Sequence, residues 1–587
     1  MLTPARASLY CCGLMFALPF LQPYHHDPLT SFYSEWLAFT LGLLAALFLL
    51  WREGGNKASF PLLALAPLGL ILVLTLQVAL GRVPYAAQAL IAALYLLWAS
   101  LMLMVGSRLG RELGLTVVAD TVAWFALAGG MLSVVAGLIQ HYGISTPMDF
   151  LVARQESAAV YGNVAQPNHY AAQLALALAS IVYLFGRRRL GAAAVVLCVA
   201  AILLLMAFTG SRSPWLYLAA FTVLALLARR LNRDNESHRF ARVAVWLLPG
   251  FLVAQGVATL IAPAQGLQVT SAQRVFQVAS GIDARLQLWS DAWRMFLGAP
   301  ILGSGWGQFS WHHFLGQAST GPGAAPGLFN NAHNLALQLL AETGIVGFLV
   351  VIGPIVIWLL DLRKITISAG WWWLLAMLTV IGIHSLLEYP LWYAYFLGPA
   401  ALLAGAGAQR AVDIRFYRAL QLTVGVCILV GVLNLFGVLA PYRDFERLVF
   451  TPKGGNAAGV QDPAFESAIA RVHREPLLTP YVELAFAYGI AVSRDRLRDK
   501  LALTARAMHF APVSVVVYRY ALLLALAGKR AAALRQLERS IEAYPADRRE
   551  VSAELEVLAR TYPAEFTPLL ELAAAKDAEL RARAVSR

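Results

Sequence analysis

Long apolar stretches alternate with short polar loops up to about residue 440, and a more polar segment follows over 441–587. A helix needs about 20 apolar residues to cross the hydrocarbon core of a bilayer, and about thirteen segments of the chain satisfy this criterion. They are 8–24, 34–51, 59–81, 84–105, 115–139, 166–186, 190–209, 214–228, 241–261, 336–360, 370–386, 391–408 and 418–440. The pattern therefore predicts an all-α polytopic transmembrane bundle over 1–440, with a long loop at 262–335, and a separate helical domain over 441–587.

The polar segment carries a repeat. Pro480, Pro512 and Pro545 recur at intervals close to those of tetratricopeptide repeats, which are about 34 residues long. Between the last two prolines, apolar residues at helical spacing lie on both sides of Gly528. This pattern predicts repeated pairs of helices joined by a short turn, and arrays of such repeats commonly present a concave binding surface. A degenerate helical domain that only packs on the bundle is the alternative, and both interpretations remain open.

Composition agrees with a membrane protein. The chain is 59% hydrophobic and 13% charged, with a mean hydropathy of +0.63, whereas roughly a quarter of the residues of a soluble chain are charged. Its four cysteines, Cys11, Cys12, Cys198 and Cys427, all lie in apolar runs, which argues against a disulfide framework and a cysteine metal site. The first run, near 9–21, lacks a convincing cleavage site and is interpreted as an uncleaved signal anchor.

Charge sets the expected orientation. The basic residues of the first 440 positions gather at every second junction between apolar runs. These residues are Arg52 and Lys57, Arg108 and Arg111, Arg187 to Arg189, Arg229 to Arg242, Arg363 and Lys364, and Arg410 to Arg418. The positive-inside rule makes that side cytoplasmic and places the N-terminus there as well. An odd number of spans then places the C-terminal domain in the periplasm of a multi-pass inner-membrane protein. The net charge of +13 is explained by these loops, so no nucleic-acid partner is expected.

Five polar clusters fall on the opposite, periplasmic face. They are Tyr161 to His169 with Gln166 and Asn168; Gly210 to Ser213 with Arg212; the loop 262–335 with Arg285, Asp291 and Arg294; Asn330 to Asn334 with His333, followed by Ala341-Glu342-Thr343-Gly344; and His384 to Tyr393 with Glu388 and Tyr389. Ionisable groups at membrane depth are hypotheses of function. Their common face strengthens that hypothesis.

Each cluster also has a structural interpretation. Asn168 and Asn334 could cap helices, with Pro167 in the first turn of one of them. Arg212 could reach lipid headgroups. An interfacial helix could carry Arg285 and Arg294 on its wet face, with its apolar face formed by Leu286, Trp289, Trp293 and Phe296. His384 and Glu388 are four residues apart and could pair along one helix. Asp120, a lone acid inside the fifth span, is treated as structural.

The chemistry favoured by these residues is transfer of a group from a lipid diphosphate. Arginine matches phosphate oxygens with a planar, permanently charged fork, so Arg212 and Arg285 are candidates to hold a diphosphate as charge develops. Histidine titrates near neutrality, which makes His333 the candidate base for an acceptor hydroxyl. The outer loops contain no Asp-x-Asp or clustered carboxylates, so we expect neither a metal ion nor a cofactor.

At these positions the chain resembles bacterial PglL-type protein O-oligosaccharyltransferases, within the group of O-antigen ligases and polymerases. His333-Asn334 with Ala341-Glu342-Thr343-Gly344 is similar to a pattern of the whole group. Gln166-Pro167-Asn168-His169 and the stretch from His384 to Tyr393 resemble the protein-glycosylating branch. The resemblance implies that Gln166, His333 and Tyr389 are critical, and that Arg212 and Arg285 hold the diphosphate. It further implies transfer of an oligosaccharide from undecaprenyl diphosphate to Ser or Thr of an exported protein, often a type IV pilin. Independently, the repeat pattern of the C-terminal domain favours a platform for the acceptor protein or the glycan.

Three alternatives remain open. An O-antigen ligase or polymerase would share the donor but use lipid A-core or a glycan as acceptor. A transporter of the same lipid would show internal repeats and broken helices around a midplane site. A membrane-anchored repeat scaffold would tolerate substitution of the outward-facing polar residues.

Overall fold

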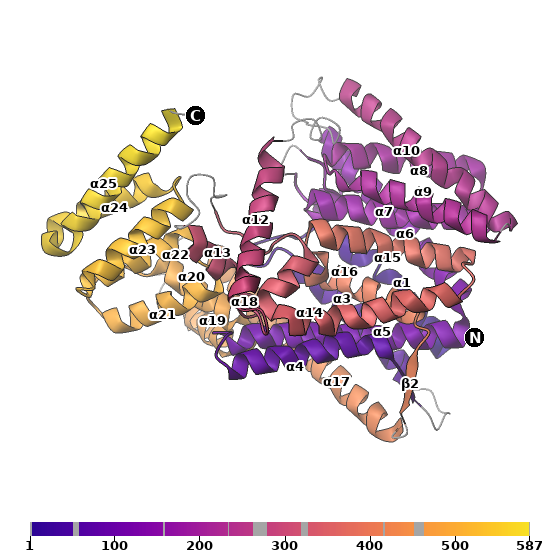
Figure 1. Cartoon of the computed structure of the whole chain (residues 1–587), viewed down its shortest axis with the longest axis horizontal. Helices are drawn as coiled ribbons and strands as arrows, with labels where there is room; N and C mark the ends of the chain where they lie inside the picture. The colour runs from indigo at the N-terminus through magenta and orange to yellow at the C-terminus, as the bar shows by residue number, and fades with distance from the viewer. Residues whose placement is uncertain are drawn as a thin grey trace.

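The computed structural model is almost entirely helical and describes residues 3–50, 58–155, 159–232, 234–261, 279–317, 327–414, 417–450 and 463–585. Each of the thirteen predicted segments contains a helix. The bundle helices are α1 (Pro4–Leu14), α2 (Leu18–Leu21), α3 (Phe32–Leu50), α4 (Leu65–Ala79), α5 (Ala86–Leu113), α6 (Leu115–Tyr142), α7 (Pro167–Gly186), α8 (Ala192–Phe208), α9 (Ser213–Asn232), α10 (Asn235–Ile261), α14 (Leu335–Asp361), α15 (Ala369–Leu387), α16 (Ala394–Ala406) and α17 (Tyr417–Gly437). Figure 1 shows most of them as one bundle of roughly parallel and antiparallel helices, with α17 oblique to the others.

Among the described residues, eleven helices are long and apolar enough to cross a membrane. The chain is therefore a multi-pass membrane protein with an all-α bundle, as the sequence predicts. The predicted spans at 190–209 and 391–408 correspond to the shorter apolar helices α8 and α16. At about 1.5 Å per residue, α16 alone is shorter than the hydrocarbon core, and it packs inside the bundle against α5.

Burial separates the centre of the bundle from its periphery. The apolar window of α7 is 94% buried, whereas that of α14 is only 17% buried. A helix that is apolar on all sides must be surrounded either by protein or by lipid. We conclude that α7 is the central helix, and that α14 presents its outer face to the membrane.

The junctions of the bundle collect at two ends. At one end, β1 (Ala58–Pro61) pairs antiparallel with β2 (Ala411–Ile414), which joins the loop after α3 to the segment before α17. At the other end, His25 contacts the carbonyl of Asn163, and Gln77 contacts that of Leu302. These contacts join loops that the charge pattern assigns to a common side in each case. Which end faces the cytoplasm stays a prediction.

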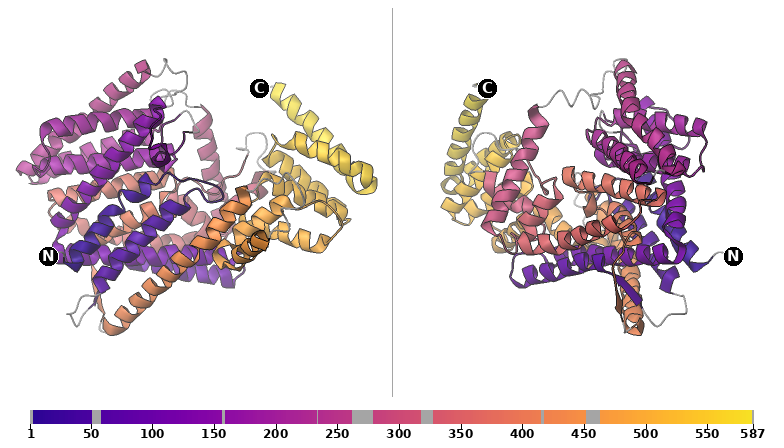
Figure 2. Two further views of the ribbon diagram at one scale, coloured as in Figure 1. Left: turned by 180° about the vertical axis from the view of Figure 1, so that it is seen from behind. Right: turned by 45° about the vertical axis from the view of Figure 1, so that its right-hand side comes forward.

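Two helices of the long loop, α12 (Ala279–Gly298) and α13 (Phe309–Gln317), lie between the bundle and the C-terminal domain (Figure 1). Of the predicted loop 262–335, residues 262–278 and 318–326 lie outside the described residues. The path to the C-terminal domain begins with α17 and α18 (Leu439–Phe450), which run diagonally across the back of the bundle (Figure 2).

The C-terminal domain consists of antiparallel helices. They are α19 (Pro463–Arg474), α20 (Thr479–Gly489), α21 (Leu497–Phe510), α22 (Ser514–Leu526), α23 (Arg530–Ala543), α24 (Arg548–Thr561) and α25 (Pro563–Val585). Each repeated proline stands at or just before the first helix of a pair, and Gly528 adopts a φ of 72° in the turn between α22 and α23. The repeat pattern thus corresponds to three helical hairpins, α20–α21, α22–α23 and α24–α25. The boundary at residue 440 falls close to the start of α18, and the division into two domains stays a prediction.

The short helix α13 docks into the C-terminal domain. Phe314, 3% exposed, packs in one apolar cluster with Met508, Val516 and Val517 of that domain. The indole of Trp311 lies 4.2 Å from the ring of His509, measured between centroids. Burial of a large aromatic side chain contributes about 1.5–3 kcal/mol. The long loop therefore joins the C-terminal domain to the bundle through packing and not only through the chain.

Candidate active site at the loop end of the bundle

The Glu388 carboxylate is the centre of the candidate site. It follows the last turn of α15, and its amide donates a hydrogen bond to the carbonyl of His384 at 2.8 Å. Its Oε1 accepts hydrogen bonds from Arg285 at 2.7 Å and Asn168 at 2.8 Å, and its Oε2 lies 2.8 Å from Nδ1 of His333. Three segments distant in sequence thus meet at one side chain that is 6% exposed. We call Asn168, Arg285, His333 and Glu388 the Glu388 cluster.

The charge state of Glu388 follows from its partners. Burial works to raise the pKa of this carboxyl. The hydrogen bond from His333 and the electrostatic interactions with His333 and Arg285 outweigh that effect, and the pKa of Glu388 lies below its ordinary value. Glu388 is therefore a carboxylate at neutral pH.

The backbone around His333 is shaped to present its ring. His333 adopts a φ of 51°, in the left-handed region that is uncommon for residues other than glycine. Its amide donates a hydrogen bond to Oδ1 of Asn331 at 2.8 Å, and the amide of Ala332 donates to Gln338 at 2.7 Å. Asn334 then caps α14 by accepting a hydrogen bond from the amide of Leu337 at 3.2 Å. This confirms the interpretation of Asn334 as a helix cap.

Aromatic rings form one wall of the site. The ring of Tyr389 meets that of His333 edge-on, with centroids 5.2 Å apart, and stacks with Tyr393 at 5.9 Å. Burial raises the pKa of Tyr389, so its phenol keeps its proton and can donate a hydrogen bond. Behind this wall, His169 packs edge-on against His384 at 5.2 Å. Both imidazoles are buried, and neither ring nitrogen of His384 has a hydrogen-bond partner among the described residues.

The start of α7 contributes Gln166 and Asn168. Gln166, not Asn168, is the N-cap, because its side-chain oxygen accepts a hydrogen bond from the amide of His169, and Pro167 occupies the first turn. The prediction that Asn168 caps a helix is wrong, since its side chain reaches Glu388 instead. The predicted side-chain pairing of His384 with Glu388 is also wrong, because Glu388 turns away from α15 towards Arg285 and His333.

Glu342 and Gly344 are structural members of their motif. The Glu342 carboxylate, in a residue 1% exposed, accepts a hydrogen bond from the amide of Phe309 at 3.1 Å. Gly344 interrupts α14 with a φ of 65°, and a Cβ there would lie 2.4 Å from the carbonyl oxygen of Ile301. The motif therefore lets the turn before α13 pack directly on α14. This packing fixes the start of α14, where His333 lies.

The arginines of α12 lie on opposite faces. Arg285 and Arg294 are nine residues apart, which is roughly 2.5 turns of an α-helix. Arg285 contacts Glu388, whereas Arg294 pairs with Asp291. A common wet face for both arginines is therefore wrong. Leu286 and Trp293 of the predicted apolar face are 53% and 47% exposed, while Leu288 and Ala292 pack against protein.

Arg212 lies in the turn between α8 and α9, at the same end of the bundle, and is half-buried. Among the described residues its side chain has no hydrogen bond or ion pair, so the structure does not join it to the Glu388 cluster. Its role as a diphosphate ligand stays a prediction, as do the roles of the other candidate residues.

The sequence did not reveal two contacts that support the site, although Asp291 belongs to a predicted polar cluster. The carboxylate of Asp291 on α12 lies 2.8 Å from Nδ1 of His313 on α13, and both residues are buried. Gln77, just before the end of α4, donates to the carbonyl of Glu342 at 2.7 Å. Nothing in their local sequence marks Asp291 and Gln77 as partners of distant residues. The first contact ties α12 to α13, and the second ties α4 to α14.

Comparison with known proteins gives two family matches. Residues 196–352 match the family described as O-Antigen ligase, and residues 372–556 match the family described as Virulence factor membrane-bound polymerase, C-terminal. The first match includes Arg285 and His333, and the second includes Glu388 and reaches into the C-terminal domain. Gln166 and Asn168 lie outside both.

Two similar proteins come from Acinetobacter baylyi. The General O-oligosaccharyltransferase is 28% identical over 449 residues, which are 75% of this chain and 76% of that protein. The ComP-specific O-oligosaccharyltransferase is 23% identical over 367 residues, 61% of this chain and 64% of that protein. The family matches and these two proteins confirm the resemblance that the sequence motifs indicate.

Proposed function

We propose that this multi-pass membrane relative of PglL-type O-oligosaccharyltransferases and O-antigen ligases is itself an oligosaccharyltransferase. It moves a preassembled glycan from undecaprenyl diphosphate to a Ser or Thr hydroxyl of an exported protein, such as a pilin. The observation that carries the proposal is the Glu388 cluster, where one carboxylate holds both His333 and Arg285 within 2.8 Å. The reaction takes place on the periplasmic face of the inner membrane.

In this proposal His333 acts through its second ring nitrogen. A proton on Nδ1, held by Glu388, leaves Nε2 free to accept a proton from the acceptor hydroxyl. Among the described residues Nε2 has no protein partner, and the side chain is 23% exposed. The orientation of an imidazole by a carboxylate is the same physical device as in the serine-protease triad. Glu388 is thus a positioning residue, and His333 is the catalytic base.

Arg285 acts on the leaving group. Its guanidinium has five N–H donors, and Glu388 accepts a hydrogen bond from only part of this set. The Arg285 side chain is 39% exposed, so the remaining donors can reach a ligand. The acceptor oxygen forms a bond to the anomeric carbon, and the bond from that carbon to the diphosphate oxygen breaks with its electron pair. The negative charge that develops on the diphosphate is stabilised by Arg285 and Arg212. The proton taken by His333 passes to the departing diphosphate or to water.

The remaining residues complete the pocket. The neutral phenol of Tyr389, beside His333, donates a hydrogen bond to the donor or acceptor. Gln166 fixes the start of α7 and so the position of Asn168 on Glu388. The reaction needs neither a metal ion nor a cofactor, because the arginines supply the charge that the diphosphate requires.

The competing function is transfer to lipid A-core or to a growing glycan, which the family matches to ligases and polymerases favour. The test uses the purified chain and an undecaprenyl-diphosphate-linked glycan. Pilin and lipid A-core are offered in separate reactions, and glycan attachment is followed by mass spectrometry. We expect modified pilin and unmodified lipid A-core. Modification of lipid A-core alone would overturn the choice of acceptor. Absence of transfer to either acceptor would overturn the proposal that the chain is an oligosaccharyltransferase.

A further inference from the structure

A groove of about 700 Å³ opens on the side of α12 that faces away from the Glu388 cluster. Its walls come from α12, from the turn 299–304, from α13 and from the loop between α4 and α5. This volume lies within the range of about 300–1,000 Å³ that is typical of small-molecule sites. We call it the lateral groove.

Two arginines line the lateral groove. The guanidinium of Arg82 donates to the carbonyl of Gly303 and has no carboxylate partner among the described residues. Arg294 pairs with Asp291, but its side chain is 48% exposed. Because a guanidinium has five N–H donors, both arginines keep donors for a ligand. His312 and Ser304 also line the groove.

The charge balance of the groove is positive. Its one carboxylate, Asp291, is already shared between Arg294 and His313. Burial lowers the pKa of His312, so this ring contributes hydrogen bonds and not charge at neutral pH. The excess positive charge is that of Arg82. Arginine holds phosphate more tightly and with more defined geometry than it holds neutral oxygen.

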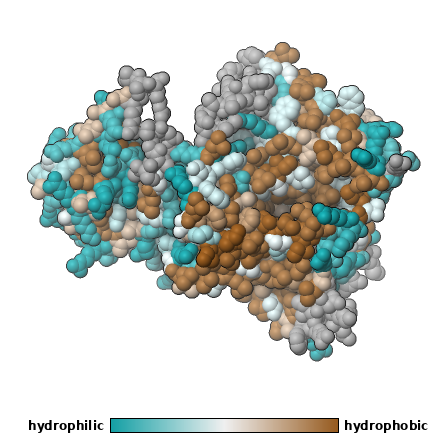
Figure 3. All heavy atoms as spheres, in the orientation of Figure 1, coloured by the Kyte–Doolittle hydropathy of each residue, from teal (hydrophilic) through white to brown (hydrophobic). Residues whose placement is uncertain are grey.

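The floor of the lateral groove continues into the lipid-facing surface of α14. Pro300 and Ile301 line the groove, and their carbonyls accept hydrogen bonds from Ile345 and Val346 at 2.8 and 3.2 Å. Ile301, Ile345 and Val346 are 65%, 39% and 38% exposed. Figure 3 shows the broad apolar surface over α14 and α4 that adjoins the more polar region near the C-terminal domain.

An amphiphile fits this arrangement. Arg82 lies just beyond the end of α4 at Ala79, at the boundary between a membrane span and the loop end of the bundle. An arginine there could merely reach towards headgroups in bulk lipid. The guanidinium of Arg82 instead points inward to Gly303, so a phosphate that it binds must enter the groove. The chain of such a lipid would then lie over Ile301 and the outer face of α14.

We propose that the lateral groove is a second lipid site, which binds a phosphate headgroup through Arg82 and Arg294 while the apolar tail lies along α14. It is separate from the diphosphate site at Arg285, because the two arginines of α12 project to opposite sides of that helix. The ligand is a phosphate-bearing lipid, either a membrane phospholipid or a polyprenyl phosphate. The inference concerns lipid binding alone and does not depend on glycan transfer.

The test is native mass spectrometry of the full chain in a neutral, phosphate-free detergent, without glycan donor or acceptor. Phosphatidylglycerol, undecaprenyl phosphate and uncharged diacylglycerol are titrated separately. We expect the double variant Arg82→Gln/Arg294→Gln to bind at least one of the two phosphate lipids about tenfold or more weakly, because two charge-assisted hydrogen-bonding partners are lost. The phosphate lipid with the larger change identifies the source of the ligand.

Three matched variants make the result specific. Arg285→Gln should keep the groove lipid, since its side chain lies on the other face of α12. Arg535→Gln, an exposed arginine of α23, should bind as wild type does. Arg82→Lys should bind with intermediate affinity, which also covers the case in which the double variant does not fold. Equal binding by wild type, the double variant and Arg82→Lys would overturn the site, as would diacylglycerol binding as tightly as the phosphate lipids.

Discussion

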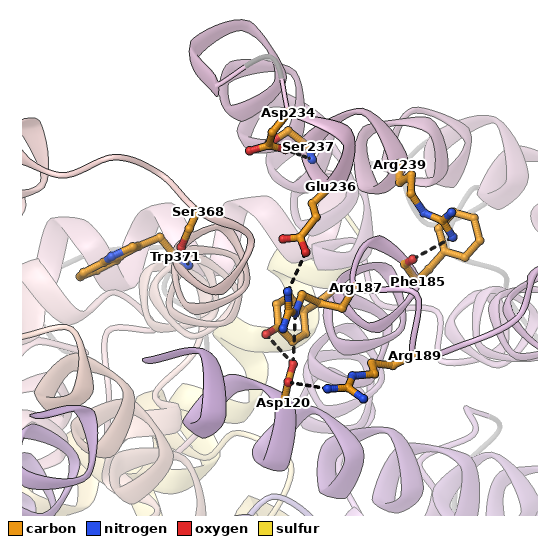
Figure 4. A network of polar contacts seen from close by, with 11 residues as sticks. Asp120, Phe185, Arg187, Arg189, Asp234, Glu236, Ser237, Arg239, Ser368 and Trp371 are labelled. Carbon is orange, nitrogen blue, oxygen red and sulfur yellow. Dashed lines mark hydrogen bonds and ion pairs between the residues drawn. The ribbon is translucent and has the colours of Figure 1, made fainter. Parts of the chain in front are cut away.

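Two carboxylate networks lie at opposite ends of the bundle, and their chemistry differs. At one end, Asp120 of α6 accepts a hydrogen bond from Tyr183 at 2.8 Å and pairs with Arg187 and Arg189 (Figure 4). Arg187 also pairs with Glu236 at 2.6 Å. At the other end, the single carboxylate of Glu388 holds Arg285, His333 and Asn168. Asp120 is therefore not the isolated acid that its sequence context indicates.

The difference lies in what remains available to a ligand. In the Asp120 network two arginines face two carboxylates, so the charges balance, and the contacts join α6, α7 and α10. In the Glu388 cluster one carboxylate, 6% exposed, serves one arginine and one histidine, whose second nitrogen has no partner among the described residues. A balanced network holds helices together. The Glu388 cluster instead holds side chains in place and leaves them N–H donors and a lone pair for chemistry.

Substitution of His333 should have the largest effect. His333→Ala removes the proposed base, and general-base catalysis contributes about 10²–10⁴ in rate. We expect kcat for glycan transfer to fall by that factor, while Asp120→Asn transfers glycan within about twofold of wild type. Single-turnover transfer from a lipid-linked glycan measures both. Equal losses of kcat in His333→Ala and Asp120→Asn would show that the two ends of the bundle do not differ in their role in transfer.

Substitution of Glu388 should have the next largest effect. Glu388→Gln keeps the shape but weakens the hold on the Arg285 guanidinium and the His333 imidazole, and hydrogen bonds to charged groups contribute about 1.5–3 kcal/mol. At about 1.4 kcal/mol per tenfold, kcat should fall by about 10- to 100-fold. Glu388→Asp should recover part of this loss only if the carboxylate acts by position. Unchanged kcat in Glu388→Gln would contradict the role of the cluster.

The sequence predicted the bundle well because its information is local. Apolar runs long enough to span a bilayer leave few alternatives to helices, and the repeated prolines marked the starts of the helical hairpins. The sequence also identified every member of the Glu388 cluster as a candidate. It did not identify which residues pair, because Asn168 and Glu388 are 220 residues apart in the chain. The opposite faces of Arg285 and Arg294 could have been found by counting helical turns.

Acid should weaken the Glu388 cluster. The pKa of the Glu388 carboxyl is lowered in the folded protein. The stability that Glu388 contributes is therefore present above its unfolded pKa, about 4.3, and is lost as the pH falls through the lower folded pKa. Between about pH 5 and pH 3 the melting temperature of wild type should therefore fall more steeply than that of Glu388→Gln. Thermal unfolding of both proteins in detergent, followed by tryptophan fluorescence, makes the comparison. Parallel curves would show that Glu388 does not contribute through its charge.

The smallest effect is expected at the Asp120 network. Asp120→Asn weakens ion pairs that are partly exposed to solvent, and such pairs contribute about 0–1 kcal/mol. The free energy of unfolding should drop by no more than about 1 kcal/mol, and the drop should shrink at high salt. Denaturant titration at low and high ionic strength measures it. A loss that does not change with salt would assign the effect to packing instead of charge.

We propose that the Glu388 cluster, and not the Asp120 network, performs glycan transfer. The most direct measurement is single-turnover transfer from an undecaprenyl-diphosphate-linked glycan to a protein acceptor by wild type, Glu388→Gln and Asp120→Asn, with donor binding measured in parallel. We expect Glu388→Gln to bind the donor but to transfer glycan about 10- to 100-fold more slowly, while Asp120→Asn matches wild type. Normal transfer by Glu388→Gln, with slow transfer by Asp120→Asn, would contradict it.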